Sequence, residues 1–118
     1  MLFRFLFDLS FYYNLNSENY NELVSKMKTY PAFGLFFSPY CGHCLHVHPI
    51  WTEVVQSYIN DTDVIAFECN VVTSKDICKK LATFDGVPHF VKYFKGKGII
   101  DLSNKLDKNK PRIVKIVE

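Results

Sequence analysis

The sequence predicts an α/β protein, with a central mixed β-sheet flanked by helices on both faces. Three observations lead to this fold class. Apolar runs of strand length alternate with amphipathic segments of helix length, two late runs are separated by a glycine-containing turn, and no linker or repeat interrupts the chain of 118 residues. Because this length suits one hydrophobic core, we expect residues 1–118 to form a single domain.

The first half of the chain predicts strand, helix, strand and helix in turn. Residues 1–8 are an apolar stretch of strand length that is too short for a membrane span. Asn19 and Glu22 have the spacing of a capping box, which predicts a helix over 19–29. The run AFGLFFS over 32–38 is apolar throughout, as in a strand covered on both faces. Farther on, WTEVVQSYIN has apolar residues at helical spacing and predicts the second helix.

The second half of the chain predicts a strand, a helix, a hairpin and a last helix. Thr73 and Asp76 have capping spacing ahead of a helical segment, Lys-Gly-Lys-Gly predicts the hairpin turn, and Pro111 suits the start of a helix. The expected ranges are 63–71 for the strand, 73–83 for the helix, 89–94 and 99–102 for the hairpin, and 111–118 for the terminal helix.

The composition argues against two classes of partner. Fourteen Lys and Arg against twelve Asp and Glu give a net charge of +2, which is too small to attract nucleic acid or an anionic membrane. The apolar start lacks the long hydrophobic region and the small-residue cleavage site of a signal peptide. We therefore expect no nucleic-acid partner and no membrane segment in this chain.

The segment Cys41-Gly-His-Cys44 lies where a predicted strand meets a predicted helix. The unpaired N–H groups and the dipole of a helix N-terminus stabilise a thiolate at Cys41, and a thiolate is the species that attacks disulfides. Cys44, three residues later, faces the same way and can close a disulfide ring with Cys41. A protonated His43 stabilises the thiolate further and favours the donation of disulfides.

The stretch from Phe37 to Cys44, FSPYCGHC, resembles the active site of protein disulfide isomerases, which have the thioredoxin fold. Two further matches support the resemblance. Pro49 corresponds to the proline in the family's active-site helix, and Gly86-Val87-Pro88 corresponds to the segment that carries its cis-proline. The resemblance covers nearly the whole chain and implies a thioredoxin fold with a cis peptide bond before Pro88.

The resemblance also implies a thiol–disulfide oxidoreductase that forms, reduces or rearranges disulfides in protein substrates. In that family the first cysteine forms the mixed disulfide, the second resolves it, and the histidine between them sets the reduction potential. Carried over residue by residue, the catalytic residues are Cys41, Cys44 and His43, and the substrate-binding residues are Tyr40, Val87 and Pro88.

Five positions depart from the family's pattern. Tyr40 replaces the usual Trp, and Leu45 replaces the usual Lys. Leu35 stands where these isomerases carry a buried Glu that helps to deprotonate the second cysteine, and Ala66 stands where a Lys often pairs with it. His89 replaces the usual Thr after the cis-proline, and we hypothesise that it serves as a substitute base for proton transfer.

Several different functions remain compatible with these residues. Cys-x-x-Cys also binds zinc, and Cys41, Cys44 and His48 fall at i, i+3 and i+7 and can share a helix face, although His46 would have to turn against the helix to join them. We expect no metal, because the proline segment has no purpose in a metal knuckle, and we expect His46 and His48 to be surface residues. A thioredoxin-like reductant and a non-catalytic peptide-binding module are also compatible with the sequence.

Cys69 and Cys78 lie nine residues apart, outside the Cys41–Cys44 motif. Related isomerase domains often carry cysteines at these two positions. Two interpretations are left open: a second, structural disulfide, or buried free thiols that serve packing alone.

The expected partners and compartment follow mainly from the resemblance. Partners are protein or peptide thiols and disulfides, with an unidentified redox partner or glutathione to recharge the site, and no dissociable cofactor is needed. We expect a monomer in the endoplasmic reticulum or secretory pathway. Asn60-Asp61-Thr62 is an N-glycosylation sequon that suits this compartment, whereas the last four residues are no retention signal, so this stretch can be one domain of a longer protein.

Overall fold

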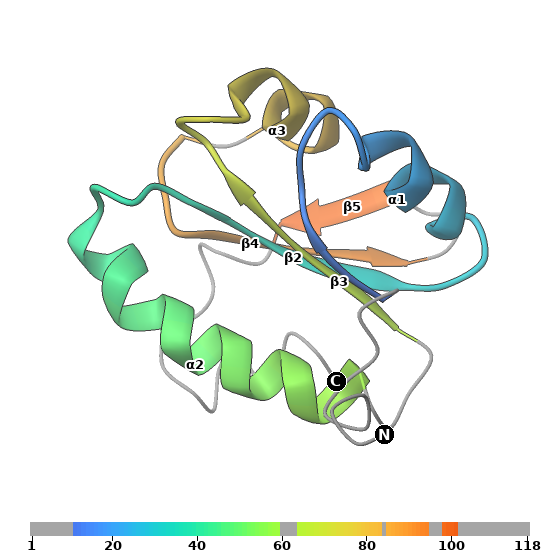
Figure 1. The fold of residues 1–118 in the computed structure, drawn as a ribbon, viewed down its shortest axis with the longest axis horizontal. Helices are drawn as coiled ribbons and strands as arrows, with labels where there is room; N and C mark the ends of the chain where they lie inside the picture. The colour runs from blue at the N-terminus through green and yellow to red at the C-terminus, as the bar shows by residue number, and fades with distance from the viewer. Residues whose placement is uncertain (1–10, 60–63, 84, 95–97, 102–118) are drawn as a thin grey trace.

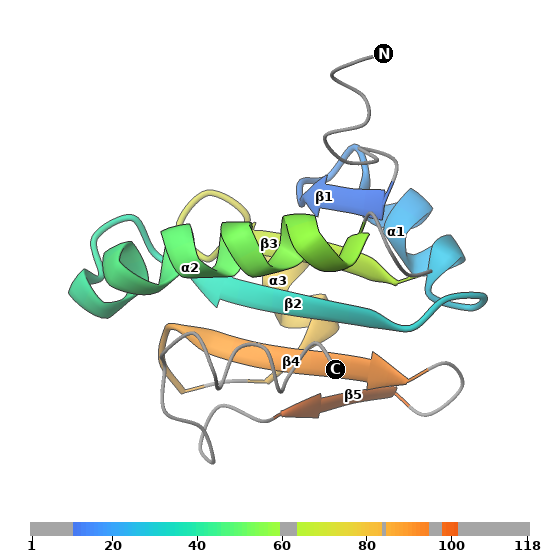
Figure 2. The same ribbon diagram turned by 90° about the horizontal axis from the view of Figure 1, so that it is seen from below.

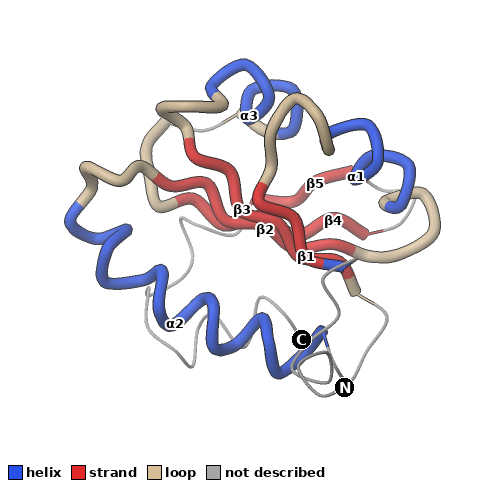
Figure 3. The backbone as a smooth tube through the Cα atoms, viewed as in Figure 1, coloured by secondary structure: helices blue, strands red, loops and turns tan. Residues whose placement is uncertain are grey.

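A computed structural model describes residues 11–59, 64–83, 85–94 and 98–101. These residues form three helices and five strands, drawn in chain order in Figure 1 and coloured by type in Figure 3. The elements are β1 (Tyr12–Asn14), α1 (Tyr20–Lys26), β2 (Ala32–Phe37), α2 (Gly42–Ile59), β3 (Ile65–Asn70), α3 (Lys75–Leu81), β4 (His89–Phe94) and β5 (Gly98–Asp101).

The strands form one mixed sheet in the order β1-β3-β2-β4-β5. The pairs β1–β3 and β3–β2 are parallel, whereas β2–β4 and β4–β5 are antiparallel. Helix α2 covers one face of this sheet, and α1 and α3 cover the other (Figures 1 and 2). The predicted α/β class, with a mixed sheet between two layers of helix, is therefore confirmed.

The central strands β2 and β3 are buried on both faces, as their apolar runs predict. Toward α2, Trp51 packs edge-on against Phe33, with ring centroids 5.4 Å apart. Residues paired across neighbouring strands point to the same face of a sheet, and successive residues along a strand alternate between faces. The register thus assigns Leu35, Glu68 and Phe90 to the α2 face, and Phe36, Cys69 and His89 to the α1 and α3 face.

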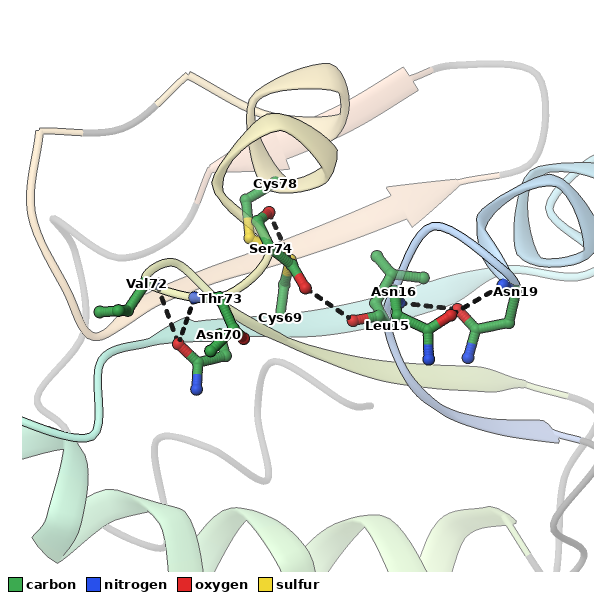
Figure 4. Close-up of a disulfide and its surroundings, with 9 residues drawn as sticks. All are labelled: Leu15, Asn16, Asn19, Cys69, Asn70, Val72, Thr73, Ser74 and Cys78. Atoms are coloured by element: carbon green, nitrogen blue, oxygen red, sulfur yellow. Dashed lines mark hydrogen bonds between the residues drawn. A yellow bond between two sulfur atoms is a disulfide. The ribbon is translucent and has the colours of Figure 1, made fainter.

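The first predicted helix cap is correct in position but lacks its side-chain hydrogen bond, and the second is displaced by one residue. The Asn19 side chain does not cap α1, and its Oδ1 accepts the Asn16 backbone N–H at 2.9 Å. Ser74 rather than Thr73 precedes α3, and its hydroxyl donates to the Leu15 carbonyl at 3.3 Å instead of capping the helix (Figure 4). The first contact lies between the end of β1 and the start of α1, and the second joins the start of α3 to the residue after β1.

The remaining elements differ from the expected ranges by a few residues at most, except for the two chain ends and for α2, which begins at Gly42, nine residues before the periodic segment that predicted it. The strand over 1–8 and the helix over 111–118 lie outside the described residues. Strand β1 was not predicted, because three residues are too few to show a clear pattern. Within the described part of the chain, no helix is both long and apolar enough to cross a membrane.

Candidate active site

Cys41 lies at the end of the turn between β2 and α2, immediately before the first residue of the helix. Two hydrogen bonds shape the turn: the Cys41 N–H donates to the Ser38 carbonyl at 3.2 Å, and the Tyr40 N–H donates to the Ser38 Oγ at 3.1 Å. The free N–H groups of the first helical turn then point toward Cys41, and the Cys44 N–H donates to the Cys41 Sγ at 3.1 Å. This contact stabilises negative charge on the sulfur, as a helix N-terminus is expected to do.

Cys44 lies one turn into α2, on the side that faces the sheet, and only 1% of its surface is exposed. Burial, together with the hydrogen bond to Cys41, raises the pKa of the Cys44 thiol to about 12. Relative to an ordinary cysteine, its thiolate fraction at neutral pH therefore falls. The two thiols are free, half-buried at Cys41 and buried at Cys44, so they differ in access.

The Val87–Pro88 segment meets Cys41 from a distant part of the chain. The Val87–Pro88 peptide bond is cis, as the resemblance implied. The Cys41 thiol donates to the Val87 carbonyl at 3.6 Å, within the range of a weak sulfur hydrogen bond. Around the half-buried sulfur, Tyr40 is 84% exposed and Leu45 is 62% exposed. This end of the molecule therefore presents apolar surface next to an accessible thiol.

The histidines lie in three different environments. His43 and His46 are exposed on the first turns of α2. His89 is buried on the α1 and α3 face, with its ring centroid 5.9 Å from that of Phe36. Because Cys44 belongs to α2, across the sheet, the structure does not bring His89 to the cysteines. Its position does not support the hypothesis of a substitute base.

The expectation that His48 is an ordinary surface residue holds only in part, because its side chain is 38% exposed but also contacts a buried acid. Its Nε2 lies 3.0 Å from the Glu68 Oε2, beneath α2, and its ring centroid lies 5.4 Å from that of Phe37. His48 therefore pairs with Glu68 and, in the described part of the chain, does not complete a metal site with Cys41 and Cys44. Among the residues that the structure describes, no three His, Cys, Asp or Glu side chains are grouped to hold a metal ion.

The sequence did not predict a polar cluster beneath α2 that is centred on a buried acid. Glu68 on β3 is 7% exposed, and it accepts a hydrogen bond from the Tyr12 hydroxyl on β1 and contacts His48 on α2. Burial raises the pKa of the Glu68 carboxyl to about 7 and lowers the pKa of His48 below its usual value. The signal was present in the sequence, since Glu68 is the one charge in the apolar run IAFECN.

Cys69 and Cys78 form a disulfide that joins the end of β3 to α3, with Cα atoms 6.1 Å apart (Figure 4). Both residues are fully buried on the α1 and α3 face. The structure therefore supports a structural disulfide and not a pair of buried free thiols. It is separated by the sheet from α2, the helix that carries Cys44.

The geometry of this site agrees with a family match that spans nearly the whole chain. Residues 11–118 match the thioredoxin family. The chain belongs to the thioredoxin family. Protein disulfide isomerases are distant homologues of this thioredoxin domain. It is 28% identical to protein disulfide-isomerase of Saccharomyces cerevisiae over 85 residues, and this alignment covers 72% of this chain and 16% of that protein. It is 29% identical over 85 residues to protein disulfide-isomerase tigA of Aspergillus niger, which covers 71% and 23%.

Another relative is the ER-retained PMA1-suppressing protein 1 of Saccharomyces cerevisiae, 32% identical over 71 residues that cover 54% of this chain and 9% of that protein. The chain thus spans about a quarter or less of the length of these relatives. Among solved structures, the first two thioredoxin domains of Saccharomyces cerevisiae Eps1p match with a TM-score of 0.69 and 23% identity, over 86% of this chain and 38% of that one. The J-Trx1 fragment of ERdj5 matches with a TM-score of 0.71 and 19% identity, over 90% and 49%. At these identities the two structures establish the fold.

Proposed function

We propose that this thioredoxin domain is a thiol–disulfide oxidoreductase of the protein disulfide isomerase type, which forms, reduces or rearranges disulfides in protein substrates. One observation carries the proposal: the half-buried Cys41 sulfur accepts the Cys44 N–H at 3.1 Å, while the Cys44 thiol is itself buried. This asymmetry gives one accessible thiol that is activated by the helix and one thiol held in reserve behind it.

The chemistry proceeds in two exchanges. The Cys41 thiolate attacks a substrate disulfide, forms a mixed disulfide and releases one substrate thiolate. Cys44 then loses its proton and attacks the Cys41 sulfur, which closes the Cys41–Cys44 disulfide and releases the second substrate thiolate. The reverse sequence donates a disulfide to a dithiol substrate. Both directions need protein or peptide thiols as partners, with glutathione or another redox protein to recharge the site.

The residues around Cys41 supply the rest of the site. His43, exposed in the first helical turn, adds positive charge near the thiolate when it is protonated and so favours the reduced form. Tyr40 offers a flat apolar surface, and the Val87–Pro88 segment places backbone groups beside the sulfur for an extended peptide. Relatives named as disulfide isomerases and as an ER-retained protein support a place in the endoplasmic reticulum or secretory pathway.

Trapping experiments on cysteine variants test this function. With a peptide that contains a disulfide, Cys44→Ser should accumulate a covalent adduct at Cys41, because the resolving thiol is gone. Cys41→Ser should form adducts at Cys44 at least about a hundredfold more slowly, because that thiol is buried and has a raised pKa. The adducts are counted by mass spectrometry after acid quenching, without reductant.

The Cys41→Ser variant also serves as the matched control, since it keeps the second cysteine and the Cys69–Cys78 disulfide. Equal adduct formation in the two variants, or adducts at Cys44 alone, would overturn the assigned roles. If neither variant forms adducts while the wild-type protein still binds the peptide, the domain is a non-catalytic peptide-binding module.

A further inference from the structure

The cluster of Tyr12, His48 and Glu68 lies apart from the Cys41 turn but beneath the same helix, α2. Glu68 is 7% exposed in the middle of the sheet, and it is the only buried carboxylate among the described residues. Its side chain is held from two elements, by the Tyr12 hydroxyl of β1 and by the His48 ring of α2 at 3.0 Å. An ionisable group at such a position is expensive to bury, so it requires an explanation.

Three elements pack against Glu68 from the α2 side of the sheet. Strand β1 contributes the Tyr12 hydroxyl, α2 contributes His48, and β2 contributes the apolar side chain of its register partner Leu35. No described cation lies within salt-bridge distance of Glu68 apart from His48 in its protonated form. Because burial raises the pKa of Glu68 to about 7, its carboxyl group takes up and releases a proton near neutral pH.

Cys44 and His48 occupy neighbouring turns on one side of α2. Residues four apart in a helix have Cβ atoms about 5–6 Å apart, so the side chains of Cys44 and His48 are neighbours on α2, and His48 in turn contacts Glu68 at 3.0 Å. Cys44 is also the group in the site with the greatest need for a base, because its thiol is buried and holds its proton tightly. Leu35, the register partner of Glu68, offers no base of its own.

We propose that Glu68, with His48 beside it, accepts the proton that Cys44 loses when it closes the disulfide with Cys41. This inference rests on the oxidoreductase function proposed above and assigns the base for its second step. The Cys44 S–H bond breaks, the proton passes to the Glu68 carboxylate, and the Cys44–Cys41 bond forms as the bond between Cys41 and the substrate breaks. The electron pair of that bond leaves with the substrate thiolate, so no other oxidant or base is needed.

The test separates the two steps in time. Reduced protein is mixed with oxidised glutathione, quenched by alkylation at intervals, and analysed by mass spectrometry for the glutathione adduct at Cys41 and for the closed disulfide. At pH 7, Glu68→Gln should leave adduct formation unchanged and slow disulfide closure on the order of a hundredfold. The deficit should shrink as the pH rises toward the pKa of the Cys44 thiol, because hydroxide then removes the proton directly.

Glu53→Gln is the matched control, since Glu53 is an exposed acid on α2, the helix that carries Cys44 and His48, and this variant should close the disulfide at the wild-type rate. Closure by Glu68→Gln at the wild-type rate and with the wild-type pH profile would overturn the inference while leaving the proposed function intact. If even the wild-type protein forms no adduct at Cys41, the proposed function itself fails.

If Glu68→Gln does not fold, a measurement on the unmutated protein still tests the inference. The carboxyl carbon of Glu68 is followed by NMR through a pH titration of the reduced protein and of the protein with Cys41 and Cys44 joined. We expect the titration midpoint of Glu68 to differ between the two redox forms, because the proton and charge balance at the cysteines changes beside it. Superimposable curves would show that Glu68 does not sense the cysteines and would overturn the inference.

Discussion

The buried carboxyl group of Glu68 has an energetic cost that the apolar residues around it do not have. Its carboxylate is taken out of water and held by two hydrogen-bonding partners, which does not fully offset the loss of hydration. The raised pKa of Glu68 reflects that imbalance. A group retained in spite of such a penalty is more informative about function than the well-packed apolar residues around it.

The same shift makes the stability of the fold depend on pH. The pKa of Glu68 rises from 4.5 to about 7 on folding, so the folded protein binds the proton more tightly than the unfolded chain does. The stabilising effect of the protonated form is complete below pH 4.5 and is lost as the pH rises through 7. The Glu68→Gln variant cannot ionise at this position. We therefore expect its free energy of unfolding to rise relative to that of wild type, by up to about 3 kcal/mol, as the pH increases from 4.5 to 7.

Urea unfolding of both proteins at several pH values measures this difference. His48 is present in both, so the opposite effect of its lowered pKa largely cancels in the comparison. A difference between the two proteins that stays constant from about pH 4.5 to 7.5 would contradict a carboxyl group that titrates near neutrality.

At the scale of elements, close contact between β2 and β3 holds the sheet beneath the site. Gly34 is paired in register with Phe67, whose ring lies over the position that a Cβ at residue 34 would occupy. Glycine is therefore required at this point for the aromatic ring to pack across the strand. The turn that carries Cys41 follows directly from the end of β2, so this pairing also fixes where the turn begins.

Replacing Gly34 should consequently disturb the core. We expect Gly34→Ala to lower the free energy of unfolding by about 1–3 kcal/mol, because the Phe67 ring must move within a packed interior. Gly86→Ala is the control, since an added methyl group there meets no atom within 4 Å. Equal stability of the two variants in thermal unfolding would show that the contact with Phe67 is not limiting.

Over the whole molecule, the sheet separates two kinds of cysteine chemistry. The free Cys41 and Cys44 thiols lie at the start of α2, whereas the Cys69–Cys78 disulfide is buried between the sheet and α3 on the opposite face. Thiolates exchange only with sulfurs that they can reach. The buried disulfide is thus expected to keep its state while the Cys41–Cys44 pair changes, which allows the fold to persist through redox cycles.

The sequence was sufficient for the parts of this arrangement that depend on local pattern. Apolar runs located β2, β3 and β4, and the Cys-x-x-Cys segment located the N-terminus of α2. It was insufficient where distant segments decide the outcome. Asn19 precedes α1 as predicted, but its side chain bonds to Asn16 instead of capping the helix, and α3 begins after Ser74 instead of after Thr73. The contact of His48 was missed because its partner Glu68 lies 20 residues away on another element.

The central claim is that Cys41 and Cys44 form a reversible redox pair that donates and rearranges disulfides, and a glutathione redox titration tests it most directly. Alkylation and mass spectrometry would follow this pair separately from Cys69 and Cys78. We predict that Cys41 and Cys44 pass from dithiol to disulfide with a midpoint near about −180 mV, while Cys69–Cys78 stays oxidised throughout. A midpoint near about −270 mV would make the domain a thioredoxin-like reductant instead, and a pair that never forms a disulfide would contradict the claim altogether.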